Sequence, residues 1–212
     1  MIKLYDYFRS SAAYRVRIAL NLKGVGYEHV GVHLVRDGGE QHKPAYKAVN
    51  PQGRVPTLEL EDGTRIIQSP AILEFIEERW PEPALLPKDD VARAHVRALA
   101  AVIACDIHPL NNLSSLGLLR GKFGADEAGV SEWYAHWITQ GFATIEALLG
   151  DTPFAGGEEP GLAEVYLVPQ VFNARRFNVP LEAFPKIVAI DAAAAALPAF
   201  VKAHPDNQPD AA

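Results

Sequence analysis

The first eighty residues combine short apolar runs with one helical pattern. Residues 2–6 (IKLYD) and 27–34 (YEHVGVHL) are rich in residues that favour β-strands. Between them, apolar residues recur at helical spacing from Ala13, and Gly24 closes the pattern. This order predicts a strand, a helix and a second strand.

A hairpin and a second helix complete this part of the chain. Residues 55–60 and 64–67 are apolar or β-branched and flank an Asp-Gly turn, which predicts two antiparallel strands. The stretch 69–80 then repeats apolar residues at helical spacing, with Ser69 as the expected N-cap and Pro70 as the first helical residue. The predicted order is β-α-β-(α)-β-β-α.

The pattern changes after a proline-rich stretch at residues 81–87, which predicts a stiff linker. Strand signals become scarce, and helical periodicity predicts four helices, at residues 91–120, 126–149, 162–174 and 185–197. The polar end 204–212 predicts a frayed tail. We therefore expect an α/β domain at residues 1–83 and an all-helical domain at 88–212.

Composition narrows the classes of protein. The chain has 212 residues, 49% of them hydrophobic, which indicates a globular protein with a sizeable core. No apolar run is long enough to span a membrane, and the start MIKLYDYFRS lacks a signal-peptide pattern, so we expect a cytoplasmic protein without a membrane partner. The net charge of −6 disfavours a nucleic-acid partner.

Cysteine and histidine usage excludes two further classes. Cys105 is the only cysteine, so the chain has no intrachain disulfide, no CxxC redox pair and no thiolate-rich zinc site. The seven histidines show no HExxH-type spacing. We expect no metal.

The stretch YFRSSAAYRVRIAL, residues 7–20, places Ser10 and Ser11 where the first helix begins. One interpretation is helix capping, since a serine oxygen accepts a hydrogen bond from a first-turn amide. The other is a site for an anion such as a thiolate, which hydroxyl donors and the positive end of the helix dipole would stabilise. The stretch by itself leaves both open.

Motifs spread over almost the whole chain carry a resemblance. They are SSAAYRVRIALNLKG, NPQGRVPTL, QSPAILEFIEE, DIHPLNNLSSL and YLVPQVFNARRFNV, in that order. Together they resemble the zeta class of glutathione transferases. The resemblance implies a thioredoxin-like N-terminal domain that binds glutathione, followed by an all-helical glutathione-transferase domain that binds the substrate.

The resemblance also implies an activity. Zeta-class enzymes include glutathione-dependent isomerases that convert maleylacetoacetate to fumarylacetoacetate in the homogentisate route of tyrosine and phenylalanine catabolism. This implies glutathione as cofactor, a small dicarboxylate as substrate and a homodimeric assembly. Three alternatives stay open: maleylpyruvate isomerisation in gentisate degradation, general glutathione transfer, and a catalytically idle module.

Site residues follow from the same resemblance. The implied glutathione contacts are Ser10, Ser11, Gln41, Val55, Pro56, Gln68, Ser69, His108, Asn112 and Ser114. The Val55–Pro56 peptide bond is expected to be cis. The implied catalytic group is Ser10, Ser11, Arg9 and Arg176. Ser10 is the leading candidate for the thiolate's donor, Ser11 is assigned to glutathione binding or capping, and Arg175 is expected to be a solvated surface charge.

The chain departs from the family pattern at several positions. Ala12 and Tyr14 stand where relatives usually have cysteine and tryptophan. Either the thiol is not required for the chemistry or this chain has an altered activity, and we favour the first. Gly161 and Glu164 replace the usual hydroxyl and aspartate of a helix-capping box, which predicts slight destabilisation without loss of the fold. Relatives associated with maleylpyruvate carry arginines where this chain has Leu113 and Ser114, which favours the longer substrate.

Overall fold

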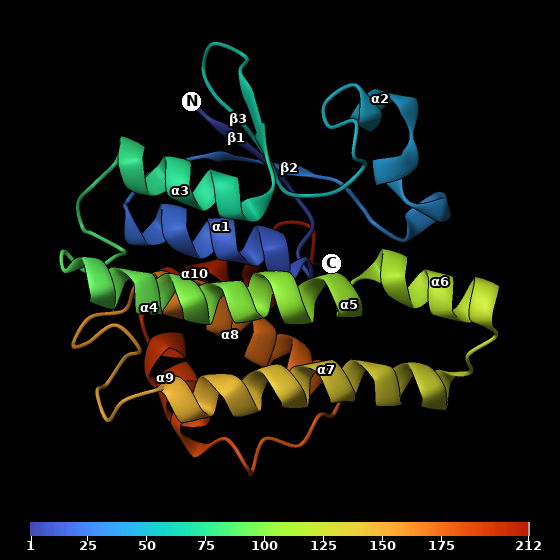
Figure 1. The fold of residues 1–212 in the computed structure, drawn as a ribbon. Coiled ribbons are helices and arrows are strands. Elements are labelled where there is room, and N and C mark those ends of the chain that lie inside the picture. Colours follow the sequence, from blue (N-terminus) through green and yellow to red (C-terminus); the bar gives the residue numbers. More distant parts are fainter. Residues whose placement is uncertain (212) are drawn as a thin grey trace. The chain divides into compact units, whose positions relative to one another are not determined.

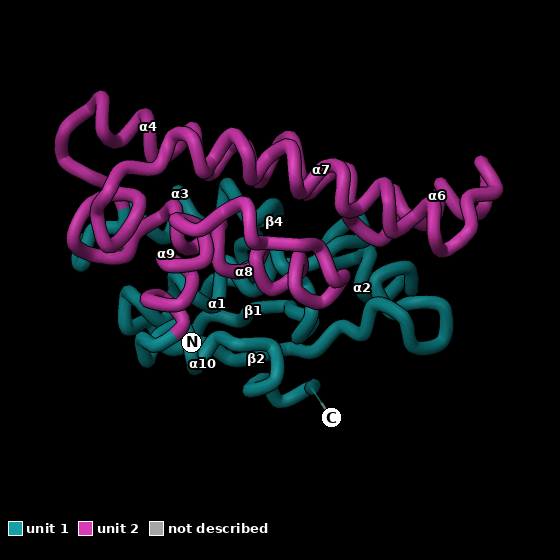
Figure 2. The backbone as a smooth tube through the Cα atoms, turned by 90° about the horizontal axis from the view of Figure 1, so that it is seen from below, with its two compact units in different colours: residues 1–85, 196–212 teal, residues 86–195 magenta. Residues whose placement is uncertain are grey.

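The computed structural model describes residues 1–211, which divide into two compact units (Figure 2). The first unit is Met1–Leu85 together with the chain from Ala196 onward, and the second is Leu86–Ala195. The domain limits expected from sequence, residues 1–83 and 88–212, stay a prediction.

The first unit contains a four-stranded sheet (Figure 1). Its strands are β1 (Lys3–Asp6), β2 (Glu28–Gly31), β3 (Thr57–Glu59) and β4 (Arg65–Ile67). The strand order is β2-β1-β3-β4, with β1 and β2 parallel and the other two pairs antiparallel. In register, Leu4 of β1 lies between His29 of β2 and Leu58 of β3. The predicted β-α-β unit and the hairpin are confirmed.

Three helices alternate with these strands along the chain: α1 (Ser11–Leu22) follows β1, α2 (Pro44–Lys47) precedes β3, and α3 (Ser69–Arg79) follows β4. Helix α1 connects the parallel strands and packs against α3. Its apolar positions Ala13, Val16 and Leu20 are fully buried, as their spacing predicts. The helix therefore holds its N-terminus in a fixed place, next to the end of β1.

The start of α3 differs from the prediction. The N-cap is Gln68, the helix begins at Ser69, and no side chain forms a cap hydrogen bond. The expected capping role of Ser69 is wrong because its hydroxyl faces the protein interior, where Nη1 of Arg15 donates to it at 3.4 Å. A contact with α1 has replaced the local cap.

The end of the chain also differs from the prediction. A helix, α10 (Pro198–Ala203), and a 3₁₀ turn (Pro205–Asn207) follow α9 and pack in the first unit. The carbonyl of Ala203 accepts from Nε of Arg17 at 2.9 Å, and the carbonyl of Ala199 accepts from Nδ2 of Asn21 at 3.0 Å. The tail at residues 204–212 was expected to fray, but its described residues form this 3₁₀ turn, and the carboxylate of Asp210 accepts from the Phe8 amide at 3.0 Å.

A buried ion pair joins β1 to α1. Nη1 of Arg17 donates to both carboxylate oxygens of Asp6, at 2.8 and 2.7 Å, and neither side chain is exposed. Nη2 of Arg17 donates to the carbonyl of Phe8 at 3.0 Å. Burial opposes ionisation of Asp6, but the charge and hydrogen bonds of Arg17 together with the neighbouring His29 outweigh it and hold the pKa of the carboxyl below its usual range.

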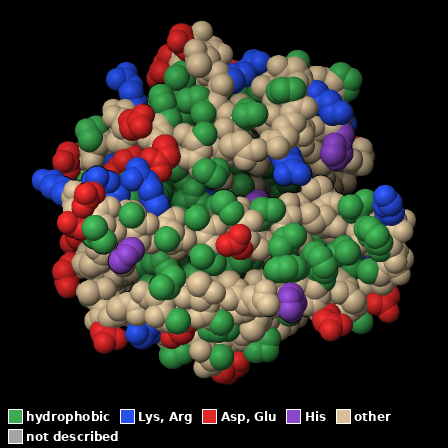
Figure 3. Space-filling model, in the orientation of Figure 1, with side chains coloured by type: hydrophobic (Ala, Val, Ile, Leu, Met, Phe, Trp, Pro, Cys, Tyr) green, Lys and Arg blue, Asp and Glu red, His purple; other side chains and the backbone are tan. Residues whose placement is uncertain are grey.

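The second unit is helical. Its elements are α4 (Asp90–Ala101), a π-helix (Val102–Ile107), α5 (His108–Asn111), α6 (Leu113–Phe123), α7 (Glu127–Leu148), α8 (Leu162–Arg176) and α9 (Pro185–Ala195). No helix within residues 1–211 has the length and apolar character to cross a membrane. Acidic and basic side chains are interspersed on the face shown in Figure 3.

The predicted single helix at 91–120 is wrong because the chain changes its winding and then turns. The π-helix follows α4 directly, and Asn112 adopts extended backbone angles between α5 and α6. Pro109 lacks an N–H and favours a helix start at this point. Gly141 of α7 permits close packing here, since a Cβ atom would lie 2.3 Å from Cδ1 of Ile107.

Helix α8 forms with glycine at its N-cap. The buried carboxylate of Glu164 accepts from the backbone N–H groups of Gly161 and Ala155, each at 2.8 Å. Burial raises the pKa of Glu164, and these amide donors act against the rise. The carboxylate half of the capping arrangement is therefore present without the hydroxyl half.

We predict that Arg17→Met lowers the free energy of unfolding by about 3–5 kcal/mol, because Asp6 is left as an uncompensated buried charge. Urea unfolding at fixed protein concentration measures the change. The double variant Asp6→Leu, Arg17→Met is the control: with both charges removed, it should lose less stability than the single variant. A single variant as stable as the unmodified protein would show that the ion pair does not hold β1 and α1 together.

Candidate active site

Ser10 is the N-cap of α1. Its backbone is extended, with φ −72° and ψ 113°, and its Oγ accepts from the amide of Ala13 at 3.3 Å. Accepting this bond leaves the hydroxyl proton to be donated outward. The capping interpretation is confirmed for Ser10, and it is compatible with a second role as donor to an anion.

The first turn of α1 suits a negative charge. It contains no acidic residue, so the positive end of the helix dipole is not offset locally. Ser11 is the first helical residue and is buried, with 6% of its surface exposed. The cap is therefore Ser10 and not Ser11. Residue 12 is a buried alanine, so no protein thiol stands at this position of the turn.

The loop that leads into α1 carries one exposed cation. The guanidinium of Arg9 lies 4.8 Å from the ring centroid of Phe8 and is open to solvent. Stacking on an aromatic face restricts the side chain without neutralising its charge. Arg9 therefore places a positive charge directly beside Ser10 in the sequence.

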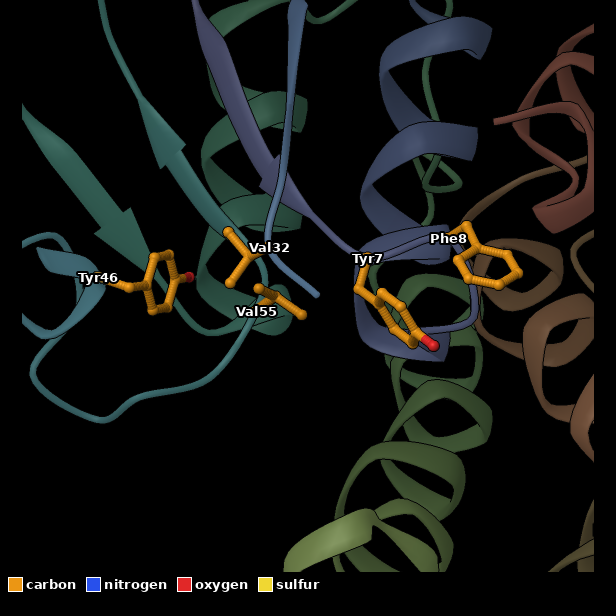
Figure 4. Close-up of a cluster of buried hydrophobic side chains, with 5 residues drawn as sticks. All are labelled: Tyr7, Phe8, Val32, Tyr46 and Val55. Carbon is orange, nitrogen blue, oxygen red and sulfur yellow. The ribbon is translucent and has the colours of Figure 1, made fainter. Parts of the chain in front are cut away.

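A hydrophobic cluster ties this loop to the turn before β3. Its buried members are Tyr7, Phe8, Val32, Tyr46 and Val55 (Figure 4). The Val55–Pro56 peptide bond is cis, as expected. The turn itself is held by Tyr46, whose hydroxyl donates to the carbonyl of Arg54 at 2.7 Å. The backbone of Val55 is thereby fixed in the same cluster as the residues preceding Ser10.

Gln41 lies beside this turn. Its Nε2 donates to the carbonyl of Leu34 at 3.0 Å, whereas its buried Oε1 has no hydrogen-bond partner among residues 1–211. Gly53 has φ +64°, and a Cβ atom there would lie 2.9 Å from the carbonyl oxygen of Gln41. Glycine is required at this close approach, which brings Gln41 against the segment that leads to Val55.

Gln68 has a strained backbone at the N-terminus of α3. Its φ of 72° and ψ of 116° fall in a region that residues with a side chain rarely adopt. Its Nε2 donates to Oε1 of Gln52 at 2.7 Å. Strain of this kind concentrates at ligand-binding sites, where the surrounding structure holds it in place.

The remaining predicted residues belong to the second unit. His108 begins α5 and is half-buried. Asn112 caps α6: its Oδ1 accepts from the amides of Ser114 and Ser115, at 3.0 and 3.1 Å, and from the Ser114 hydroxyl at 2.6 Å. This cap gives Asn112 a structural role. The glutathione contacts expected for His108, Asn112 and Ser114 stay a prediction.

Two neighbouring arginines at the end of α8 have different environments. Arg175 has 51% of its side chain exposed, as expected of a surface charge, but it also forms an ion pair with the buried carboxylate of Asp191. Arg176 is exposed, and its guanidinium lies 4.8 Å from the Phe177 ring centroid. Within the described residues Arg176 forms no ion pair. Its charge is therefore available to an anion.

The structure brings the predicted residues of the first unit into one connected region. Ser10, Val55 and Gln41 are linked through the hydrophobic cluster and its turn, and Ser69 is linked to α1 by Arg15. Sequence reasoning missed Arg15 and Arg17 as supporting residues. The sequence carried a signal for them, because both arginines stand within the otherwise apolar stretch 12–20 of α1.

Chemically, this region can hold an anionic peptide. Two helix N-termini, those of α1 and α3, favour negative groups. The Oε1 of Gln41 can accept from an amide, and Val55 presents backbone groups before the strand ladder of β3 begins at Thr57. No group of three His, Cys, Asp or Glu side chains that could hold a metal occurs within residues 1–211.

The fold and this region define a protein of the glutathione-transferase class. Residues 9–79 match the family model for the glutathione S-transferase N-terminal domain. A thioredoxin-like sheet with a helical second part is the arrangement of that fold.

Comparison with individual proteins identifies the family. The chain is 56% identical to a maleylacetoacetate isomerase of Pseudomonas aeruginosa, over 99% of this chain and 98% of the relative. It is 51% identical to a solved maleylpyruvate isomerase of the zeta class, covering 99% and 100% of the two chains with a TM-score of 0.95. A maleylacetoacetate isomerase from Methylobacterium extorquens, solved with malonate and glutathione, gives 39% identity, 99% coverage of both chains and a TM-score of 0.94. The chain belongs to the zeta-class glutathione transferases.

We predict that Gln68→Gly raises the free energy of unfolding by about 1–2 kcal/mol, because glycine adopts this backbone without the steric cost. Thermal or urea unfolding measures the gain. Asp37→Gly is the matched control, since Asp37 has φ 51° and ψ 40°, a left-handed region that aspartate tolerates. A loss of stability in Gln68→Gly, or an equal gain in both variants, would contradict strain at Gln68.

Proposed function

We propose that this protein is a glutathione-dependent cis–trans isomerase that converts maleylacetoacetate to fumarylacetoacetate in the homogentisate route of tyrosine and phenylalanine catabolism. Membership of the zeta class and the names of the isomerases above support this proposal. A cytoplasmic homodimer is part of the proposal and is carried over from the family. Size-exclusion chromatography with light scattering tests the assembly.

The observation that carries the proposal is the hydroxyl of Ser10 at a helix N-terminus without acidic residues. Glutathione fits the first unit by the chemistry of its parts. The thiolate would accept from Ser10, the γ-glutamyl carboxylate would bind at the N-terminus of α3 near Gln68 and Ser69, and the peptide part would meet Val55. The buried Oε1 of Gln41 offers an acceptor to an amide of the ligand.

When bound, glutathione supplies a thiol nucleophile that adds reversibly to the substrate's cis double bond and is released unchanged after rotation about the resulting single bond. A free thiol has a pKa of about 8.5, so only a small fraction is ionised at neutral pH. Lowering that pKa by about two units requires roughly 2.7 kcal/mol of preference for the thiolate. A hydroxyl donor and a helix dipole together have this magnitude.

Positively charged side chains would bind the substrate and stabilise the negative charge that develops on it. The substrate is a dianion, and negative charge spreads onto its carbonyl oxygens in the transition state. Arg9 lies in the loop before Ser10 and Arg176 at the end of α8, and neither charge is neutralised by an ion pair within the described residues. We assign them to binding the carboxylates and stabilising the developing charge. Because residue 12 is alanine, the proposed mechanism uses no protein thiol in this turn.

Two other activities are alternatives within the fold. Maleylpyruvate isomerisation is supported by the 51% identity to a zeta-class maleylpyruvate isomerase. General glutathione transfer would need the same thiolate site and no fixed cations. An idle module would not need Ser10, Val55–Pro56 and Arg176 together, so their joint presence argues against it.

We predict that Ser10→Ala lowers kcat for maleylacetoacetate by at least about tenfold, since loss of one charge-assisted hydrogen bond costs roughly 1.5–3 kcal/mol. Ser11→Ala should mainly weaken glutathione binding. The exposed Ser131→Ala on α7 is the control and should behave as the unmodified enzyme. An ultraviolet assay of the isomerisation and titration calorimetry with glutathione provide the measurements. Wild-type turnover and affinity in both site variants would leave the serine pair with a structural role only.

We predict that maleylacetoacetate is preferred to maleylpyruvate by at least about tenfold in kcat/KM, roughly 1.4 kcal/mol in transition-state binding. The reason is that Leu113 and Ser114, both exposed in the first turn of α6, offer no cation to a shorter substrate's second carboxylate.

Steady-state kinetics on both acids tests this preference. Replacing Leu113 and Ser114 by arginine should narrow the ratio, whereas Leu118→Arg, which adds one arginine further along α6, should leave it unchanged. Equal values for the two acids, or a preference for maleylpyruvate, would move the assignment to the alternative substrate.

A further inference from the structure

Both backbone polar groups of Phe8, two residues before Ser10, are bound by charged side chains, of which Arg17 is buried and Asp210 is partly buried. The N–H of Phe8 donates to Oδ2 of Asp210 at 3.0 Å. The carbonyl of Phe8 accepts from Nη2 of Arg17 at 3.0 Å. The loop that ends at Ser10 is therefore held from two sides, by its own helix α1 and by the end of the chain.

Asp210 also contacts the side chain of His29. Its Oδ1 lies 3.3 Å from Nε2 of His29, and that nitrogen lies 3.4 Å from Oδ2 of Asp6. The contact with Asp6 raises the pKa of His29, burial acts against the rise, the charges of Asp6 and Asp210 add to it, and Arg17 opposes it. A protonated His29 would join the two carboxylates.

Three further hydrogen bonds fix the end of the chain. Nε of Arg17 donates to the carbonyl of Ala203, and Nε2 of Gln208 donates to the carbonyls of Lys202 and His204, each at 2.9 Å. Ala211 packs against the hydrophobic cluster that includes Tyr7, Phe8 and Val55. The segment 203–211 thus contacts the loop before Ser10 through one charged side chain and one apolar side chain.

We infer that Asp210 is a positioning residue for the thiolate site: by binding the Phe8 amide, it holds the loop 7–10 so that the Ser10 hydroxyl stays directed at the anion. This inference rests on the proposed function of Ser10. A displacement of the loop by a fraction of an ångström weakens a charge-assisted hydrogen bond, because such bonds depend on distance and angle. The effect should appear in thiol ionisation and turnover more than in glutathione affinity.

The test compares Asp210→Ala with Asp206→Ala in the full-length enzyme. Asp206 lies in the same segment, carries the same charge and has 80% of its side chain exposed, so it is the matched control. Asp210→Ala should lower kcat by about fivefold and move the acidic limb of the kcat/KM–pH profile up by about half a unit or more, with glutathione affinity within about twofold. Asp210→Asn keeps an oxygen for the Phe8 amide and should recover most of the activity.

Each outcome distinguishes the inference from the function on which it rests. If Asp210→Ala matches Asp206→Ala while Ser10→Ala loses turnover and shifts the profile, the positioning role is overturned and the thiolate role stands. If Ser10→Ala itself keeps the wild-type turnover and profile, the proposed function fails. Should Asp210→Ala not fold, Asp210→Glu replaces it, since it keeps the charge and moves the carboxylate by one methylene; wild-type behaviour of that variant overturns the inference.

Discussion

The buried pair of Asp6 and Arg17 is the interaction on which the first unit depends. Two charges without solvent contact are stable here because Arg17 uses its remaining donors on the carbonyls of Phe8 and Ala203. One guanidinium thereby connects the end of β1, the loop before Ser10, helix α1 and the C-terminal segment. The geometry of the α1 N-terminus follows from these contacts, because the helix cannot move along β1 without separating the charges.

The ability of the site to bind an anion then follows from the N-terminus of helix α1. Ser10 satisfies one amide of α1 and keeps a proton to donate, and the first turn has no acidic residue to offset the dipole. The strained Gln68 and buried Ser69 provide a second helix N-terminus in the same unit. An anionic tripeptide can thus be bound at both ends by backbone and hydroxyl donors, without a metal or a protein thiol.

Local periodicity predicted the elements well where a helix or strand is decided by its own residues, as in β1, α1 and the β3–β4 hairpin. It failed where contacts with residues distant in the sequence determine the local structure. Ser69 has the composition of an N-cap, but Arg15 donates to its hydroxyl. The tail after Ala203 looks unfolded, but its Asp210 accepts from the Phe8 amide. The π-helix at 102–107 has no local signature, because it depends on packing against α7 at Gly141. Site residues came from motif resemblance, and their supporting contacts came only from the structure.

The central claim is that the N-terminus of α1 stabilises a thiolate. The most direct measurement is an ultraviolet titration of the thiolate absorbance of glutathione bound to the unmodified enzyme, with S-methylglutathione as the reference. The account predicts that the bound thiol ionises about two pH units below the value of about 8.5 for a free thiol. An unchanged or raised midpoint for bound glutathione would contradict it.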